Sequence, residues 1–170
     1  MEVNNGPFIF TEEQRFGQIW LWLVLIGMDV AYFTMFFTQF IGPVPPRPSG
    51  PADLLVMGLV ALLCLGITVL FVSLKLITRV TNQGISVQFI PLHRKPVMFP
   101  FSDIGQYSVR TYRPILEFGG WGIKRGSGGR AYNVSGNKGL QLVLKDGKRI
   151  LIGTQKPEQL GTIMDSVMKR

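Results

Sequence analysis

Two long apolar runs near the start of the chain constrain its fold more than any other feature. Residues 17–41 carry one charged side chain, Asp29, and residues 54–77 are charged only at Lys75, near the end of the run. A helix rises about 1.5 Å per residue, so runs of this length cross a hydrocarbon core of about 30 Å. A chain of 170 residues cannot bury both runs in one core. The sequence therefore predicts two transmembrane helices.

Short segments beside the apolar runs predict where the helices begin and turn. Thr11 is followed three residues later by Gln14, with acids between them, which is typical of a capping box at a helix start. The first helix is therefore expected to begin soon after Thr11. Residues 42–53 hold five prolines, which predict a stiff, non-helical turn between antiparallel helices. The acidic start of the chain differs from the basic start of a signal peptide, so no cleavage is expected.

Basic residues are concentrated after the second apolar run. Of the 18 basic residues, only Arg15 and Arg47 precede Lys75, which leaves 16 from Lys75 onward against five acids. Basic flanks favour the cytoplasmic side, so both termini are predicted to be cytoplasmic and the proline-rich turn to lie outside. Such a charge favours contact with anionic headgroups of membrane lipids. No nucleic-acid-binding motif is present, so nucleic acid is not an expected partner.

Asp29 lies near the middle of the first apolar run, where a carboxyl group is costly. A central Asp costs about 2.5–3.5 kcal/mol on insertion scales, which the apolar residues of the run offset. One interpretation is a hydrogen bond within the helix pair, to Thr68, Tyr32 or a backbone carbonyl, or a contact between copies of the chain. The other is a proton or ion relay in a transport complex, although neither run holds a second central acid or base. The sequence leaves both open.

After residue 77 the continuous apolar pattern changes to an alternating one. Alternation of apolar and polar residues is typical of strands with one buried face. Short strands separated by Gly, Pro and Asn predict a compact antiparallel β-sandwich or barrel of about seven strands. The candidate strands are residues 85–89, 97–99, 104–111, 121–124, 131–134, 140–144 and 149–152.

The end of the chain predicts a helix that covers the β domain. Pro157 suits a first helical turn. The apolar residues that follow recur at helical spacing and are expected to pack on the core. They are Leu160, Ile163, Met164, Val167 and Met168.

Two short motifs resemble a known family. They are residues 78–85, TRVTNQGI, and residues 101–104, FSDI. They resemble the bacterial pleckstrin-homology-like domains of small membrane proteins, in which two transmembrane helices often precede the domain. The resemblance covers residues 78–170 and implies a bent β-sandwich of about seven strands capped by a C-terminal helix. It also implies interaction or scaffolding near a membrane rather than catalysis. Residues 112–137 are similar to an uncharacterised branch of these proteins.

Residues 110–130 form the most unusual segment, because six glycines lie among five basic residues and one acid. Glycine-rich turns can present backbone N–H groups to an anion, and neighbouring cations add to the attraction. The alternative is a long hairpin loop, in which the glycines of 119–129 supply positive φ and the tryptophan packs on the barrel. No dinucleotide-binding or Walker pattern is present. The candidate residues for anionic lipid or a partner are Arg110, Arg113, Trp121, Lys124, Arg125 and Arg130.

The residues available for catalysis are few. The chain has one histidine, His93, and one cysteine, Cys64, which lies in an apolar run. Neither Ser102 nor Glu117 has a recognisable set of catalytic partners, so no enzyme, cofactor or metal site is expected. The basic turn His93-Arg94-Lys95 is expected to be solvated, with contact to headgroups as the alternative.

These observations predict three parts: an N-terminal cytoplasmic segment 1–16, a transmembrane hairpin 17–77 and a β domain 78–170. The leading hypothesis is a non-enzymatic interaction or scaffold module, in which the β domain binds a protein partner, another copy of the chain or anionic lipid. The alternative is a small accessory subunit of a transport or ion-translocating complex that uses Asp29.

Overall fold

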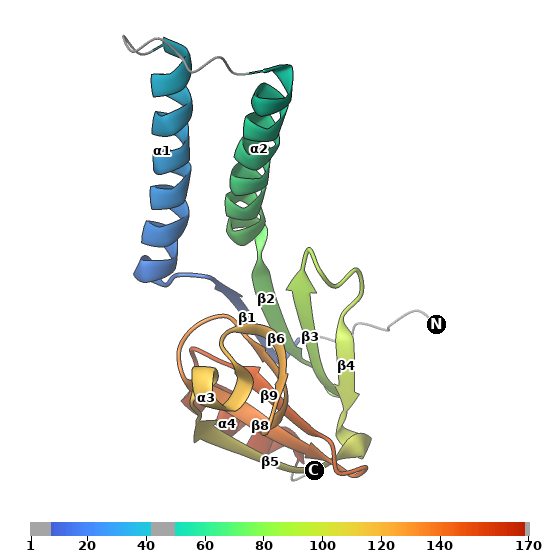
Figure 1. Ribbon diagram of the computed structural model, residues 1–170. Coiled ribbons are helices and arrows are strands. Elements are labelled where there is room, and N and C mark those ends of the chain that lie inside the picture. Colours follow the sequence, from blue (N-terminus) through green and yellow to red (C-terminus); the bar gives the residue numbers. More distant parts are fainter. Residues whose placement is uncertain (1–7, 42–49, 169–170) are drawn as a thin grey trace. The chain divides into compact units, whose positions relative to one another are not determined.

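The computed structural model describes residues 8–41 and 50–168, which form two compact units (Figure 1). The helical unit comprises residues 17–73. The β unit comprises the described residues on both sides of it, 8–16 and 74–168. The predicted fold class is confirmed in its coarse form, two apolar helices and a mostly β region with a C-terminal helix. Of the segment before the first helix, the described residues 8–16 belong to the β unit.

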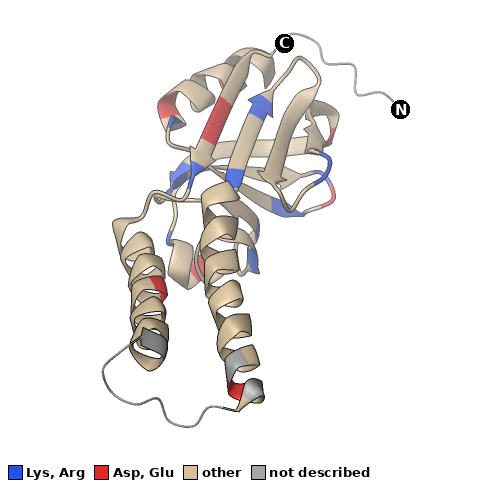
Figure 2. Cartoon of the chain, turned by 90° about the horizontal axis from the view of Figure 1, so that it is seen from above, with Lys and Arg blue, Asp and Glu red and all other residues tan. Residues whose placement is uncertain are grey.

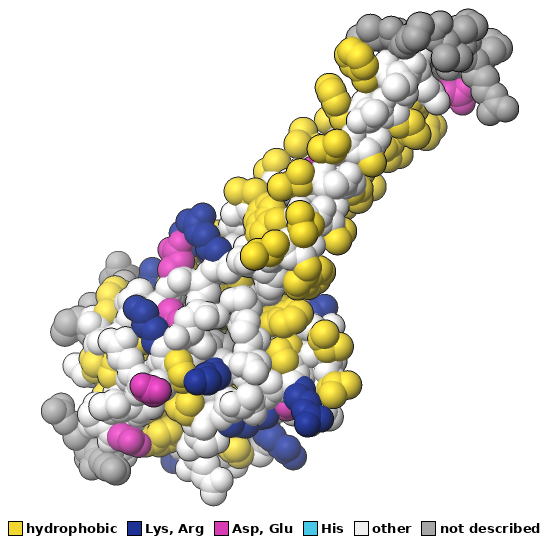
Figure 3. Space-filling model, turned by 90° about the vertical axis from the view of Figure 1, so that its left-hand side faces the viewer, with side chains coloured by type: hydrophobic (Ala, Val, Ile, Leu, Met, Phe, Trp, Pro, Cys, Tyr) yellow, Lys and Arg dark blue, Asp and Glu magenta, His cyan; other side chains and the backbone are white. Residues whose placement is uncertain are grey.

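The helical unit contains α1 (Ile19–Ile41) and α2 (Pro51–Ser73), which lie side by side. Both are long and apolar enough to cross a membrane. Apolar side chains cover their surface, and charged side chains are concentrated on the β unit (Figures 2 and 3). Most of the predicted proline-rich turn lies at 42–49, outside the described residues. Its last residues, 51–53, instead form the first turn of α2, where proline is well tolerated.

The first sheet has the strand order β1-β2-β3-β4. These strands are β1 (Phe10–Arg15), β2 (Lys75–Val80), β3 (Gly84–Ile90) and β4 (Val97–Pro100), and all neighbours are antiparallel. Two predictions are wrong here. The segment from Thr11 to Gln14 is a strand and not a helix cap, and the second helix ends at Ser73, so residues 75–77 belong to β2.

The inward face of β1 explains why its sequence does not look like a strand. Residues 10, 12 and 14 are buried and alternate with exposed ones, but two of the three are polar. The Glu12 carboxylate accepts hydrogen bonds from the Thr154 hydroxyl (2.6 Å) and from the Gln155 backbone N–H (2.7 Å). The Gln14 amide donates to the Gly153 carbonyl (2.8 Å). Most of these buried polar groups are satisfied because the end of β9 and the loop after it supply hydrogen-bond partners; the Gln14 Oε1 has no partner among the described residues.

The second sheet has the order β5-β8-β9-β7-β6. Its strands are β5 (Ile104–Thr111), β6 (Gly122–Gly126), β7 (Gly129–Asn133), β8 (Lys138–Leu144) and β9 (Arg149–Gly153). All pairs are antiparallel except β7 and β9, which are parallel. The prediction of a purely antiparallel domain is therefore wrong. The β8–β9 hairpin inserts β9 between β8 and β7, and this makes β9 run in the direction of β7.

The described residues of the β unit form nine strands, compared with the seven or so expected, together with three short or terminal helices. A 3₁₀ helix (Phe101–Asp103) precedes β5, and α3 (Pro114–Phe118) follows it. The C-terminal helix α4 (Pro157–Met168) packs on β5 and β8, as the apolar spacing predicts. Leu160 and Met164 of α4 are fully buried.

Candidate functional site

The six candidate basic and aromatic residues do not form one site. The segment that holds them is not a single loop, because α3, β6 and β7 lie within it. Two of the six, Arg125 and Arg130, come together at a cleft. The others lie on different surfaces or have partners inside the β unit.

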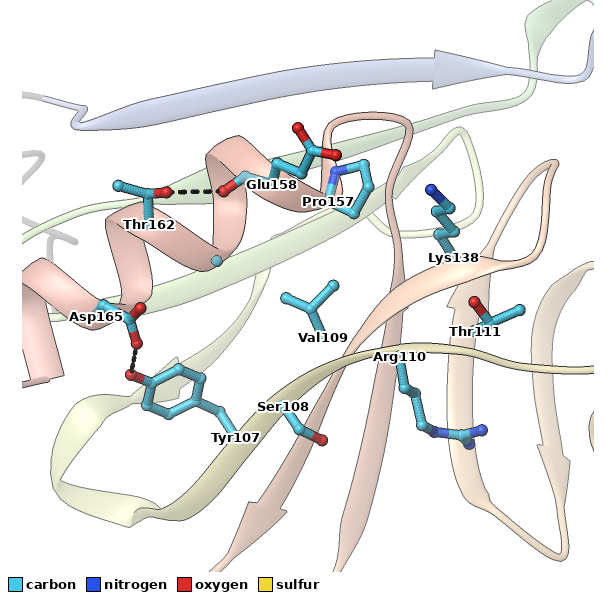
Figure 4. Close-up of a pocket in the computed structure, with 11 residues that line it drawn as sticks. Tyr107, Ser108, Val109, Arg110, Thr111, Lys138, Pro157, Glu158, Thr162 and Asp165 are labelled. Carbon is cyan, nitrogen blue, oxygen red and sulfur yellow. Dashed lines mark hydrogen bonds between the residues drawn. The ribbon is translucent and has the colours of Figure 1, made fainter.

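Arg110 is engaged in contacts within the β unit. Its guanidinium forms an ion pair with Glu117 (2.7 Å) and also donates to the Gln141 side chain (3.0 Å). In Figure 4 the Arg110 side chain extends away from α4, and the residue is one of those that line the cleft between β5 and that helix. The hydrogen bond from Arg110 lowers the pKa of Glu117, helped by the backbone N–H of Arg113. Arg110 therefore holds α3 against the sheet rather than offering a free charge.

Arg113 and Trp121 lie on either side of α3. Arg113 is the residue before the helix and has an exposed side chain, while its backbone N–H donates to Glu117 (2.7 Å). The Trp121 indole N–H donates to the Gly136 carbonyl (3.0 Å). That bond ties the tryptophan to the β7–β8 connection. Neither Arg113 nor Trp121 lines the cleft at Arg125.

The cleft between β5 and α4, which is shown in Figure 4, contains one notable polar contact. The Tyr107 hydroxyl donates to Asp165 of α4 (2.6 Å), and this hydrogen bond raises the pKa of the tyrosine. A tyrosine held in its neutral form links β5 to α4. This contact fastens the helix and offers no reactive group.

Arg125 and Arg130 are directly opposite each other in the β6–β7 pair. Opposite residues of an antiparallel pair point to the same face, so the two guanidinium groups share one surface. Both side chains are exposed, and neither forms an ion pair with any residue that the structure describes. The Arg130 guanidinium lies over the ring of Tyr132, 5.5 Å from its centroid. Like charges placed opposite each other are unfavourable without a counter-ion.

The two arginines line a cleft of about 680 Å³ between β4 and the second sheet. Its other charged residues come from the β8–β9 hairpin and from the 3₁₀ helix. Lys148 is paired with Asp146 (2.6 Å), and that hydrogen bond lowers the pKa of the acid. The cleft therefore keeps an excess of positive charge. The charged lining residues are Asp103, Arg125, Arg130, Asp146, Lys148 and Arg149.

Lys124 illustrates why position in the strand matters. It lies next to Arg125 in β6 but is opposite Ala131, so it points to the other face of the sheet. It does not line the cleft. Sequence reasoning included Lys124 and missed Lys148 and Arg149, although the hairpin sequence KDGKR was a visible basic turn.

His93 lies on the β3–β4 loop and packs on the same tyrosine as Arg130. Its ring centroid is 5.9 Å from that of Tyr132. Its Nδ1 accepts the backbone N–H of Phe89 (3.3 Å), which requires that nitrogen to be unprotonated. Burial, and the nearby charge of Arg130, lower the pKa of His93. The histidine is thus a neutral structural contact.

In the helical unit, Asp29 connects the two helices. Its carboxyl oxygen accepts a hydrogen bond from the Thr68 hydroxyl (2.7 Å), which is one of the contacts expected from the sequence. The Tyr32 hydroxyl donates to the Met57 carbonyl (2.6 Å). Asp29 and Tyr32 also line an apolar groove of about 660 Å³ on the helix pair. Asp29 is therefore part of helix pairing.

No group of three or more His, Cys, Asp or Glu side chains in the described residues is arranged to hold a metal ion. The cleft at Arg125 and Arg130 remains the strongest candidate for binding, because it combines space, positive charge and unpaired donors. No protein-family model matches the chain, and no curated protein matches it.

Proposed function

We propose that the chain is a non-enzymatic interaction module anchored in a membrane by α1 and α2. Its basic β unit holds an anionic group of a protein partner, or of another copy of the chain, between Arg125 and Arg130. The observation that carries the proposal is this pair of opposed arginines, which have no counter-ion among the described residues. The resemblance of residues 78–170 to pleckstrin-homology-like domains supports an interaction role at a bacterial cytoplasmic membrane.

Anchoring is supported by the exposed side chains of the helical unit. Leu23 of α1 is 69% exposed and Leu62 of α2 is 68% exposed, and many of their apolar neighbours are also exposed. Soluble proteins rarely leave apolar surfaces of this extent open to water. A bilayer would cover these side chains and so remove the free-energy cost of exposing them to water.

The pairing of β1 with β2 supports two crossings with both flanks in one compartment. β1 precedes α1 and β2 follows α2, yet Arg15 and Lys75 are paired neighbours in the sheet. Two strands can pair only on the same side of a membrane. This argument is independent of the count of basic residues, which favours the cytoplasm as the shared side.

The chemistry of the cleft favours an anionic side chain. Arginine presents planar donors that match a carboxylate or phosphate, and such bonds are about twice as strong as neutral ones. Beside the arginines, the cleft is lined by the β4 residues Val97, Met98 and Phe99. This mixture of cations and apolar side chains suits a peptide segment with an acidic residue.

The binding proposal is tested by the double variant Arg125→Gln/Arg130→Gln. We expect the affinity for a partner to fall about 100-fold, since each of the two lost charge-assisted contacts is worth about 1.5 kcal/mol. The full-length protein is extracted gently from its membrane, and the mass of the native complex is measured. The matched control is Lys124→Gln, on the same strand but the opposite face.

In this experiment the wild type and Lys124→Gln should retain a protein partner, or form a homo-oligomer, that the double variant loses. Retention of the partner by the double variant would contradict the role of the cleft. A monomer that carries only anionic lipid would contradict the interaction role itself.

The alternative, an accessory subunit of an ion-translocating complex, rests on Asp29 and its groove. Our proposal expects Asp29→Asn to leave partner binding unchanged, because an asparagine carbonyl still accepts the Thr68 hydroxyl. Proteoliposomes with an internal pH dye provide the measurement. A proton flux that depends on the wild-type chain and disappears in Asp29→Asn would favour the alternative.

A further inference from the structure

We propose that the β3–β4 loop, residues 91–96, rests on the membrane surface, with Leu92 in the interface and Arg94 and Lys95 against anionic phospholipid headgroups. This inference rests on the proposed crossing of the membrane by α1 and α2. The proposed lipid-contact surface is separate from the Arg125–Arg130 cleft, which none of residues 91–96 lines.

The register of the first sheet determines which of its ends carries the loop. Arg15 is paired with Lys75, and Lys75 is paired with Ile90. The loop after Ile90 therefore leaves the sheet at the same end at which β1 leads toward α1 and α2 leads into β2. The opposite end carries the β2–β3 turn, between Val80 and Gly84.

Chain connectivity keeps this end of the sheet close to the membrane. Only Leu74 separates the last residue of α2 from the first residue of β2. Two consecutive peptide units span at most about 7 Å, so Lys75 cannot lie far from the end of a membrane-spanning α2. A loop that projects from the same end is therefore within reach of the headgroups.

The exposed residues of the loop suit a lipid surface. Leu92 is 57% exposed although it is a large apolar residue, and the side chains of Arg94 and Lys95 are exposed beside it. Neither cation forms an ion pair within the part of the chain that the structure describes. An apolar side chain flanked by unpaired cations can enter the interface while the charges meet lipid phosphates.

Two other cations at this end of the sheet share one acidic partner. Glu13 of β1 forms ion pairs with Arg15 (3.0 Å) and with Lys75 (3.1 Å). This cluster keeps one net positive charge, so the two loop cations, Arg94 and Lys95, carry the larger share of the positive charge at this end.

His93 holds the loop in a defined conformation. Its backbone N–H donates to the Phe89 carbonyl (2.6 Å), and its own carbonyl accepts from the Gln88 amide (3.3 Å). With the ring packed on Tyr132, the residues on both sides of His93 are directed to solvent. Binding to a surface therefore requires little ordering of the loop.

The test uses the full-length chain in lipid nanodiscs with a fluorescent label on one cysteine. The native cysteine, Cys64 of α2, is replaced by alanine, and Leu92→Cys or Asn82→Cys supplies the labelling site. Asn82 is the matched control, because it is exposed on the turn at the opposite end of the same sheet. Nanodiscs contain phosphatidylcholine with 30% or no phosphatidylglycerol, and lipids that carry a spin label near the headgroup quench the fluorophore.

We expect at least threefold stronger quenching at position 92 than at position 82 in anionic nanodiscs. The quenching should fall toward that of position 82 when Arg94→Gln/Lys95→Gln is added or when phosphatidylglycerol is omitted. Equal quenching at positions 92 and 82 would overturn the inference.

A separate sample, labelled at Cys64, reports on membrane insertion, because its fluorophore is quenched by lipids that carry a spin label deep in the acyl chain. Strong quenching at Cys64 with none at position 92 refutes the loop contact alone, and no quenching at Cys64 refutes membrane insertion and the loop contact together.

Discussion

Replacing Glu12 by alanine is expected to destabilise the β unit by about 3 kcal/mol. The substitution removes a buried carboxylate that accepts from the Thr154 hydroxyl and from the Gln155 backbone N–H. Hydrogen bonds to charged groups contribute about 1.5–3 kcal/mol each, and a buried donor left without a partner adds to the loss. We expect backbone amides of β1 to exchange with solvent about 100-fold faster. Hydrogen exchange of the full-length protein in detergent, read by mass spectrometry, measures this effect.

The neighbouring substitution Glu13→Ala provides the control. Glu13 is on the same strand but points outward, and its ion pairs with Arg15 and Lys75 lie on the surface. Such pairs contribute little, so exchange in β1 should remain close to that of the wild type. If the two variants behaved alike, the buried contact of Glu12 would not be what fastens β1 to the loop after β9.

Replacing Gly129 by alanine is expected to have the second large effect, a loss of about 4 kcal/mol or more. Gly129 has a φ of +100°, and an added Cβ would overlap the Arg149 carbonyl oxygen and lie 2.7 Å from the Arg149 Cβ. The unfavourable backbone conformation alone costs about 1–3 kcal/mol, and the overlap forces β7 away from β9. Because Arg130 follows directly, partner binding at the cleft should be lost as well. Thermal unfolding in detergent and the native mass of the complex measure the two effects.

Gly147→Ala separates the two causes. Gly147 also has a positive φ, +83°, but no atom lies within 4 Å of an added Cβ. This variant should therefore show only the cost of the backbone conformation, about 1 kcal/mol, and should keep its partner. A Gly129→Ala protein no less stable than Gly147→Ala would show that β7 does not need its close approach to β9.

The sequence predicts the helices and most strands because a single local pattern specifies each of them. Continuous apolar runs specify α1 and α2, and alternation specifies β3 and β8 to within two residues at each end. The residues of α4 that are most deeply buried follow from the helical spacing of apolar side chains. In these elements local propensity and tertiary packing agree.

The first strand could not be predicted from local pattern. Its inward residues at 12 and 14 are polar, and their partners at Gly153, Thr154 and Gln155 lie about 140 residues away in the sequence. The boundary between α2 and β2 also could not be predicted from local pattern. Apolar residues of β2 continue the apolar run of the helix, so the pattern does not mark the boundary.

The sequence names Arg125 and Arg130 among its six candidate residues, but it does not predict which of the six lie together. Arg125 and Arg130 form a pair because a tight turn places them opposite each other, and the same turn directs Lys124 to the other face. Arg110 was expected to be free, but Glu117 and Gln141 occupy its donors. Strand register and pairing decide which cations remain available, and neither can be read from spacing alone.

The position of the helices between β1 and β2 has a topological consequence. Residues 16–74 occupy the place of the connecting loop of a β-hairpin, because the strands that they join are paired from Phe10 with Val80 to Arg15 with Lys75. The β unit is thus a discontinuous domain with the helical hairpin as its insertion. Insertions at such a loop leave the pairing of the flanking strands unchanged, so the length of the hairpin can match a bilayer independently of the sheet. Such a domain also cannot be completed during synthesis until β2, which follows α2, has emerged to meet β1.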